Sequence, residues 1–461
     1  MYRKKTFRIE SVRTNWTEVE GELENEIHNL YFDSFNTASA SEKYAIFTKI
    51  VSNAIKNYTP KKRFVNNKIH RNPVYWWDAE CDKVLRLRKA AYKKFTFSGI
   101  EKDYVNFKKH RAIAKKTFKN KKRECYIKFV ESINNLTNKT YVWNKSKILK
   151  NKWVKIKPNH NPENHQESAR ILEATDKICP PWCSTDPEWI PDTESNEFLS
   201  SIFTFAEFNL ALDNKNSRSS PGLDGIDYQT IKNLPNKYKL ILLDIFNEMY
   251  VTNSYPLDWK NTYVHFVKKN DNKSIRPISL TSSLCKLFET LIKNKLQFWV
   301  ETQNILPPSQ SGFRKGQSTC DNVTNFLLFI EESFSNKKDV LAAFLDVQGA
   351  FDNVNIDLLL TKLADIGCPY NLIKFVKHIC TDRHIFTVET ESNYQTANKG
   401  LPQGGVLSPL LYCIYVAAII NNIPSKVNIS QFADDLVICS SFSTVEECRT
   451  IIESSVLTIY K

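Results

Sequence analysis

The stretch ISQFADDLVICSS, residues 429–441, places two adjacent acids, Asp434 and Asp435, inside an apolar run. Aspartate is depleted in strands and is almost never buried without a partner. Two unit charges ~4 Å apart repel by roughly 4 kcal/mol at an effective dielectric near 20. A solvated β-turn would accept the pair, but no Gly, Pro or Asn punctuates the run. We therefore expect the two acids to be buried and compensated by a bound cation.

A third acid, Asp346, ends a second apolar segment, residues 340–345, shortly before Gly349. Mg²⁺ prefers oxygen ligands and usually takes one or two carboxylates together with substrate phosphates. We expect Asp346 and Asp434, with the backbone carbonyl of Val347, to hold two Mg²⁺ ions ~3.5–4 Å apart. Such a pair stabilises the attacking 3′-hydroxyl and the leaving pyrophosphate of an in-line displacement, so these residues predict a nucleotidyl transfer.

The composition changes along the chain and predicts four segments. Residues 1–74 have helical periodicity, and residues 75–155 form a basic, aromatic-rich helical stretch. Residues 156–200 are rich in Pro, Asn, Ser and acids, which is typical of a linker. Residues 201–461 alternate helices and strands. The elements expected there are helices over 234–253, 282–306 and 406–420, a strand over 340–345 and a hairpin over 262–280.

The formal net charge is +14, and almost all of the excess lies in one segment. Residues 86–128 contain 16 Lys or Arg against 3 acids. Charge of one sign on this scale indicates a polyanionic partner, with the basic side chains contacting phosphates. The alternative is a solvated face without a partner. Most of the aromatic side chains in this segment are expected to pack against neighbouring helices rather than to stack on bases.

The start of the chain has no apolar segment of the kind found in secretory signals, and its longest apolar run, residues 406–420, is short for a membrane span. The 11 cysteines are scattered and odd in number, which indicates reduced thiols. We expect no membrane contact and a location in the nucleus, the cytoplasm or both. Four clustered residues could bind zinc instead of belonging to a simple Pro-rich connector, although their spacing matches no standard zinc finger. They are His160, His165, Cys179 and Cys183.

Taken in order along the chain, these motifs resemble those of a known enzyme family. The strand end from Asp346 to Phe351, the stretch GLPQGGVLSPLL at 400–411 and FADD at 432–435 are similar to motifs A, B and C of reverse transcriptases. SRSSPGLDGI, RPISLTSSLCKLFE and QSGFRKGQST resemble further blocks of jockey-like non-LTR retrotransposon enzymes. The basic stretch YWWDAECDKVLRLRKAAYKKF at 75–95 resembles their connector after the endonuclease. The resemblance implies an α+β fold, with the fingers and palm of a right-hand polymerase and an antiparallel palm sheet backed by helices.

The resemblance also implies roles for individual residues around the reacting nucleotide. Asp346 and Asp434 would be metal ligands, with Asp435 as the neighbouring acid near the primer end. Phe351 would be the steric gate under the 2′ position of the sugar, and Gln403, followed by Gly404, would touch the incoming nucleotide.

Further contacts to substrate and template are implied in the same way. Arg276 would lie over the incoming base and reach its phosphates, and Lys268 would contact the triphosphate, a role for which Lys269 and Lys273 compete. Four residues would lie along the template: Gln310, Gly312, Phe313 and Arg314.

The function implied is RNA-directed DNA synthesis during target-primed retrotransposition, with two Mg²⁺ ions, dNTPs, a DNA primer and an RNA template. The family has an endonuclease before this region and a thumb after it, so we expect the chain to be a fragment that ends soon after motif C. Two alternatives stay open: a nucleic-acid-binding remnant without polymerase turnover, and a group II intron-like reverse transcriptase. The oligomeric state is not indicated by the sequence.

Overall fold

The computed structural model describes residues 14–30, 33–59, 76–134, 142, 165–180, 189–191, 193, 196–268, 275–387 and 394–460. The chain divides into two units. The larger unit comprises Met1–Lys61 and His165–Lys461, and the smaller one comprises Lys62–Asn164.

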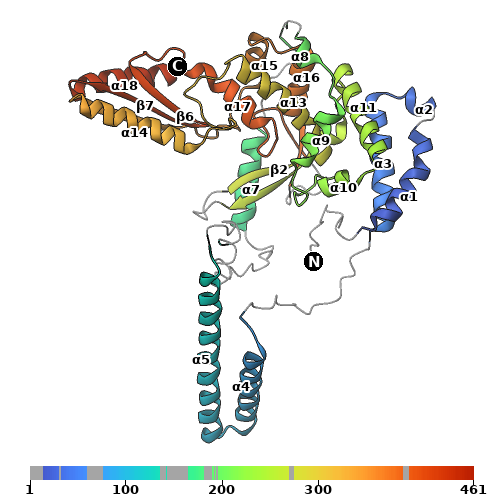
Figure 1. The fold of residues 1–461 in the computed structure, drawn as a ribbon, viewed down its shortest axis with the longest axis vertical. Helices are drawn as coiled ribbons and strands as arrows, with labels where there is room; N and C mark the ends of the chain where they lie inside the picture. The colour runs from blue at the N-terminus through green and yellow to red at the C-terminus, as the bar shows by residue number, and fades with distance from the viewer. Residues whose placement is uncertain are drawn as a thin grey trace. The chain divides into compact units, whose positions relative to one another are not determined.

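The larger unit is mostly helical (Figure 1). Its helices before the first strand are α1 (Trp16–Glu26), η2 (Ile27–Leu30), α2 (Asp33–Asn36), α3 (Ala40–Tyr58), α7 (His165–Ile178), α8 (Glu197–Ser200), α9 (Phe205–Asp213), α10 (Tyr228–Asn233), α11 (Asn236–Thr252) and α12 (Leu257–Lys260). Its later helices are α13 (Ser283–Thr302), α14 (Thr319–Ser335), α15 (Ile356–Asp365), α16 (Tyr370–Cys380), α17 (Ser408–Val416), η3 (Ala417–Ile420) and α18 (Val445–Tyr460). Helices α11, α13 and α17 confirm the three helices expected from the apolar pattern.

Two small sheets complete this unit, which has the mixed composition that the sequence predicts. The strands are β1 (Asn261–Lys268), β2 (Ile275–Leu280), β3 (Asp339–Asp346), β4 (Arg383–Phe386), β5 (Gln395–Ala397), β6 (Val427–Phe432) and β7 (Asp435–Phe442). The order β3-β7-β6 is antiparallel throughout, as expected. In the other sheet, β2-β1-β4-β5, the expected β1–β2 hairpin is confirmed, but β1 and β4 run parallel, which the sequence pattern did not predict.

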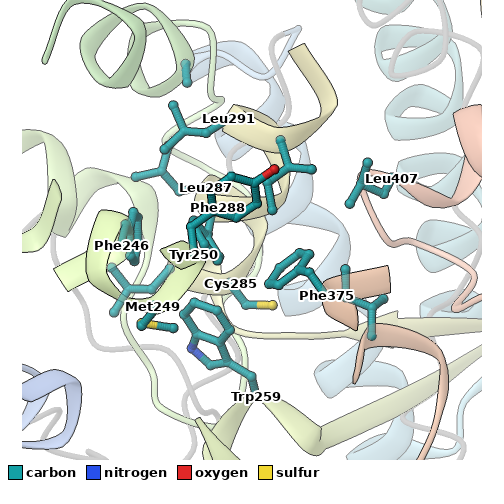
Figure 2. Packing of buried hydrophobic residues seen from close by; sticks show 14 of the residues in the cluster. Phe246, Met249, Tyr250, Trp259, Cys285, Leu287, Phe288, Leu291, Phe375 and Leu407 are labelled. Carbon is teal, nitrogen blue, oxygen red and sulfur yellow. The ribbon is translucent and has the colours of Figure 1, made fainter. Parts of the chain in front are cut away.

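Helix α13 forms the centre of the main core. Its apolar residues recur three and four positions apart, at Leu284, Leu287, Phe288 and Leu291, and all of them are buried. Phe288 contacts the rings of residues from several other elements, with centroids 4.9 Å from Phe246, 5.7 Å from Trp259 and 4.9 Å from Phe375. Figure 2 shows these side chains gathered around α13. The core therefore joins helices that are distant in the sequence.

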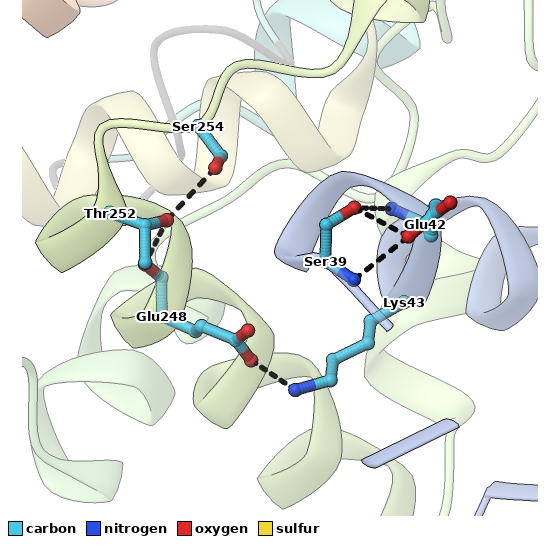
Figure 3. A network of polar contacts seen from close by, with 6 residues as sticks. All are labelled: Ser39, Glu42, Lys43, Glu248, Thr252 and Ser254. Carbon is cyan, nitrogen blue, oxygen red and sulfur yellow. Dashed lines mark hydrogen bonds and ion pairs between the residues drawn. The ribbon is translucent and has the colours of Figure 1, made fainter. Parts of the chain in front are cut away.

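The N-terminal helices pack on α11. The Tyr238 hydroxyl donates to the carbonyl of Leu23 at 2.6 Å, and Lys43 forms an ion pair with Glu248 at 2.6 Å. Helix α3 begins with a capping box, in which Ser39 and Glu42 exchange hydrogen bonds (Figure 3). Helices α1 and α3 are thus part of the same core as α11.

The antiparallel sheet has a helix beside each face, α18 on one and α14 on the other, although Phe344 on the α14 face is still 71% exposed. Successive strand residues point to opposite faces, and Leu341, Ala343 and Leu345 of β3 belong to the cluster that contains residues of α18. On the other face, Phe344 contacts Phe326 of α14 edge to face, with centroids 5.9 Å apart. Figure 1 shows α14 and α18 running along this sheet. Asp346, the last residue of β3, therefore lies at the end of a sheet that packs between α14 and α18.

A helix lies within residues 156–200, for which we expected a linker. Helix α7 contacts β2, and Ile178 and Cys179 at its C-terminal end pack against the apolar cluster of the four-stranded sheet. The described part of this segment is therefore packed structure, although its composition resembles a connector.

In the smaller unit, residues 76–134 are described and form a hairpin of two helices, α4 (Ala79–Ser98) and α5 (Glu101–Glu131), joined at Gly99. Gly99 caps α4 with φ of 64°, the left-handed conformation that glycine adopts easily. The rings of Tyr92 and Phe107 lie 5.1 Å apart, and those of Phe95 and Tyr104 lie 5.0 Å apart. These contacts confirm the expectation that the aromatic side chains mainly pack between helices.

The packing around α13 gives a stability prediction. Phe288→Ala should lower the free energy of unfolding by about 3–5 kcal/mol, because it leaves a cavity lined by aromatic rings. Phe298→Ala, on the same helix with the ring 60% exposed, should cost roughly 1 kcal/mol or less. Urea unfolding followed by circular dichroism measures both. Equal losses would show that the core is not centred on Phe288.

Candidate active site

The structure brings the three predicted acids together at one end of the antiparallel sheet. Asp346, the last residue of β3, lies opposite Asp435, the first residue of β7. Phe432 at the end of β6 also pairs with Asp435, so Ala433 and Asp434 form the two-residue turn between the strands. Carboxylates from two distant stretches of sequence therefore share one sheet end.

The expectation that Asp434 and Asp435 are buried, rather than lying at a β-turn, is wrong. Asp346 and Asp435 are exposed, and Asp434 is half-buried in the turn. The run lacks Gly, Pro and Asn, but Ala433 adopts φ of 59° and makes the turn without them. A residue with a Cβ atom in this left-handed region costs about 1–2 kcal/mol. Other contacts must therefore stabilise the turn.

The side chain of Gln310 supplies those contacts. It is buried, and its Oε1 accepts from the backbone N–H of Ala433 at 2.9 Å and from that of Gly312 at 2.8 Å. Its Nε2 donates to the Ala433 carbonyl at 3.4 Å. Backbone hydrogen bonds from Ser311 to Gln431 and from Gln431 to Ser309 run alongside. Gln310 therefore fixes the turn that carries Asp434, and its predicted contact with a template stays a prediction.

Gly312 allows the close approach of these two segments. A Cβ atom at this position would lie 2.2 Å from the backbone nitrogen of Ala433. Real Cβ atoms do not approach backbone this closely, so any other residue would push the two segments apart. Gly312 is therefore required for the position of the acid turn.

The next two residues of this loop differ in how freely they could meet a ligand. Phe313 is 47% exposed, has φ of 60°, and its ring lies edge to face with that of Phe351 at 6.5 Å. The guanidinium of Arg314 is paired with Glu301 and also donates to the carbonyls of Pro307 and Gln310 at 3.1 Å. Arg314 therefore holds the loop, while Phe313 offers an exposed surface.

Phe351 and Tyr412 form a stacked pair beside the acids. Phe351 is half-buried, and its ring stacks on that of Tyr412 with centroids 5.1 Å apart and an angle of 17° between the planes. Burial raises the pKa of Tyr412, and the charges of Asp434 and Asp346 raise it further. The Tyr412 hydroxyl is therefore within electrostatic reach of both acids. Sequence reasoning missed Tyr412; its one signal is a tyrosine inside the apolar run 406–420.

The residues expected at the nucleotide gather where β2 meets the loop before α17. The backbone carbonyl of Gln403 accepts from the N–H of Ser279 at 2.8 Å. Gly404 follows with φ of 104°, and a Cβ atom there would lie 3.0 Å from the Ser279 carbonyl. On the same strand as Ser279, Arg276 is exposed, and Ile275 pairs with Lys268 across the hairpin. Strand β2 thus carries the predicted arginine and also contacts the loop that carries the predicted glutamine.

The donor atoms at the acid end fit Mg²⁺ by their chemistry. Carboxylate oxygens of Asp346 and Asp434 and the carbonyl of Val347 are the kinds of ligand that this ion prefers. Within the described ranges, none of the three acids has a hydrogen-bond or ion-pair partner for its carboxylate. In the same part of the chain, no group of three or more His, Cys, Asp or Glu residues is gathered closely enough to hold a metal by itself. Other oxygen ligands would therefore have to complete the coordination.

The zinc alternative cannot be followed through the structure. His160 and Cys183 lie outside the described residues, as does the side chain of His165. Cys179 is half-buried, and burial raises the pKa of its thiol to about 11.

None of the helices in the described ranges is both long and apolar enough to cross a membrane.

Comparisons with known proteins match the part of the chain that contains the three acids. A family model described as Reverse transcriptase (RNA-dependent DNA polymerase) matches residues 267–457. Over 257 residues the chain is 33% identical to "Probable RNA-directed DNA polymerase from transposon BS" of Drosophila melanogaster, covering 52% of this chain and 28% of the relative. Over 241 residues it is 31% identical to "RNA-directed DNA polymerase from mobile element jockey" of the same organism, covering 50% and 26%. The chain thus spans only about a quarter of the length of these curated relatives.

The contact between Gly312 and the acid turn can be tested by adding a single methyl group. Gly312→Ala should lower the melting temperature by several degrees, because the new Cβ atom displaces Ala433. Gly21→Ala, in helix α1 with no atom within 4 Å of the added Cβ, should be neutral or slightly stabilising. Differential scanning calorimetry of both variants measures the difference. A Gly312→Ala protein that melts with the wild type would contradict the close approach.

Proposed function

Because the chain belongs to the reverse transcriptase family of non-LTR retrotransposons, with its matched domain at residues 267–457, we propose that it extends a DNA primer on an RNA template. The observation that carries this proposal is the set of three carboxylates at one sheet end, which have no hydrogen-bond or ion-pair partner among the described residues, next to the stacked Phe351 and Tyr412. Like charges at one sheet end repel each other, and a bound cation would relieve this repulsion.

We propose that Asp346, Asp434 and the Val347 carbonyl hold two Mg²⁺ ions. When bound, such ions stabilise the charge that develops on the attacking and leaving oxygens of a nucleotidyl transfer. The chain itself keeps the carboxylates in place: the β3–β7 register sets Asp346 against Asp435, and Gln310 fixes the turn that carries Asp434. Asp435 would lie beside the end of the primer.

The remaining site residues would bind and select the nucleotide. The exposed Arg276 on β2, with Lys268 across the hairpin, would meet the negatively charged triphosphate. Gln403 and Gly404 would border the sugar and base, and Phe351 would reject a 2′-hydroxyl by contact. The exposed ring of Phe313 would lie against the template.

The two-helix hairpin supports a second property, the binding of nucleic acid through phosphates. Exposed basic residues on α5 include Lys109, Arg111, Lys115, Lys116 and Lys119. Two pairs of aromatic rings in the hairpin pack against each other, whereas Phe97 is 96% exposed and Tyr126 is 46% exposed. The exposed lysines and arginines would contact the sugar-phosphate backbone. We propose that this unit binds template RNA without strong sequence preference, and that the protein acts as a ribonucleoprotein in the nucleus or cytoplasm.

A nucleic-acid-binding remnant is the competing function, because it needs the basic hairpin but not the acids. The group II intron-like alternative is less favoured, because the relatives named above come from transposon BS and the mobile element jockey.

The acids are tested by isosteric neutralisation. Asp346→Asn and Asp434→Asn should each weaken Mn²⁺ binding, followed by electron paramagnetic resonance, and abolish Mg²⁺-dependent extension of oligo(dT) on poly(rA), because a neutral amide is a poorer ligand. Asp339→Asn, at the opposite end of β3 and also exposed, should change neither. Full extension by either site variant would overturn the assignment. Wild-type RNA binding without extension would favour the remnant.

The hairpin is tested through the salt dependence of binding. Replacing Lys115, Lys116 and Lys119 with Gln should reduce the slope of log K against log salt by about 2, since each contact to a single-stranded phosphate contributes about −0.7. Replacing Lys237, Lys338 and Lys426, which are also exposed but lie outside the hairpin, should leave the slope nearly unchanged. Fluorescence anisotropy with unrelated RNA oligomers measures both. Equal slopes for the two triple variants would mean that the hairpin is a solvated surface.

A further inference from the structure

Asp352 has no role in the function proposed above, yet its carboxylate contacts the predicted nucleotide site. It directly follows Phe351 and is half-buried. Its Oδ1 accepts a hydrogen bond from Nε2 of Gln403 at 2.9 Å, across 51 positions of sequence. The residue thus connects the turn after β3 with the loop before α17.

The backbone around this contact is fixed by a buried arginine. Arg383 donates through Nε to the Cys380 carbonyl at 3.1 Å and through Nη2 to the carbonyls of Lys399 and Gly400. A Cβ atom at Gly400 would lie 2.7 Å from the Asp352 carbonyl, so the loop approaches the turn as closely as glycine allows. The two segments that carry Asp352 and Gln403 are therefore held together independently of their side-chain contact.

The chemistry of the contact determines which way the Gln403 amide faces. An ionised carboxylate only accepts hydrogen bonds, so the amide nitrogen of Gln403 must be the atom that faces Asp352. Because the two polar ends of a planar amide point apart, Oε1 then faces away from Asp352. Burial raises the pKa of Asp352, while Gln403 and the charges of Arg383 and Lys399 lower it. The basic groups nearby thus favour the ionised form.

The contact borders a small cleft where several distant segments meet. Its lining includes Pro277 and Ser279 of β2, Asp352, Arg383 and Gln403. We propose that Asp352 is a positioning residue that orients the Gln403 amide toward a deoxynucleoside triphosphate bound beside this cleft, which is itself too small to hold the ligand. The inference rests on the proposed function for the identity of the ligand. Asp352 does not touch the nucleotide itself, and it acts only through Gln403.

Four variants separate positioning from mere structural support. Asp352→Ala removes the acceptor, whereas Asp352→Asn keeps an oxygen that can accept from Gln403. Gln403→Ala removes the group through which Asp352 would act, and the double variant Asp352→Ala/Gln403→Ala completes a cycle. Asn353→Ala is the matched control, because Asn353 contacts Lys399 of the same loop at 2.9 Å but not Gln403.

The measurement is dTTP binding by isothermal titration calorimetry, with poly(rA)·oligo(dT) present and Ca²⁺ replacing Mg²⁺ so that no turnover is needed. Asp352→Ala should weaken dTTP binding roughly 10-fold, the size expected for a hydrogen bond to a charged group. Asp352→Asn should stay within about 3-fold of the wild type, and Asn353→Ala should match it. In the Gln403→Ala background, Asp352→Ala should add less than about a 2-fold effect. Melting temperatures of all variants are recorded alongside.

Several results would overturn the inference. An unchanged affinity in Asp352→Ala would do so, as would a full additional loss in the double variant, because a structural defect acts whether or not Gln403 is present. A wild-type chain that binds no dTTP would do so as well. If the chain binds dTTP with the expected pattern but shows no Mg²⁺-dependent extension, the proposed polymerase function fails and the positioning role stands.

Discussion

The acid end of the sheet depends on one buried amide. Gln310 makes two hydrogen bonds to Ala433 and one to Gly312, and these bonds hold Ala433 in a left-handed conformation that it would rarely adopt alone. The strands bring Asp346 and Asp435 face to face, but they do not fix Asp434, which lies in the turn beyond them. A loop from another part of the chain therefore places the third carboxylate.

The helical core supports this arrangement through a second buried polar group. Glu289 of α13 lies in the main core, and its Oε2 accepts from the backbone N–H of Val406 at 2.7 Å and of Leu407 at 3.2 Å. Burial raises the pKa of this carboxyl, and the two backbone donors lower it. The bonds anchor the start of α17, which carries Tyr412, and the end of the loop that contains Gln403. Helix α13 thus helps to position both Tyr412 and the loop that carries Gln403.

Features set by local pattern could be predicted from the sequence, and features set by distant contacts could not. Apolar periodicity predicts α11, α13 and the β1–β2 hairpin, and an acid that ends an apolar run predicts the position of Asp346 at a strand end. The turn at Ala433 could not be predicted, because its stabilising partner, Gln310, is 123 positions away. The contacts of Asp352 with Gln403 and of Arg383 with Lys399 could not be predicted either, because each joins residues that are far apart in the sequence. Helix α7 was missed because its surroundings are rich in Pro and Asn, although the helix itself packs on a sheet.

The packing of the N-terminal helices on α11 has a consequence for the order of folding. The contact between Leu23 and Tyr238 spans 215 positions, and that between Lys43 and Glu248 spans 205. At a synthesis rate of ~5–20 residues per second, α11 is made on the order of 10–40 s after α1 and α3, whose apolar faces it covers. The hairpin of α4 and α5 is made in that interval and needs only its own neighbouring residues. The basic hairpin can therefore fold and bind a polyanion before α1 and α3 have packed on α11.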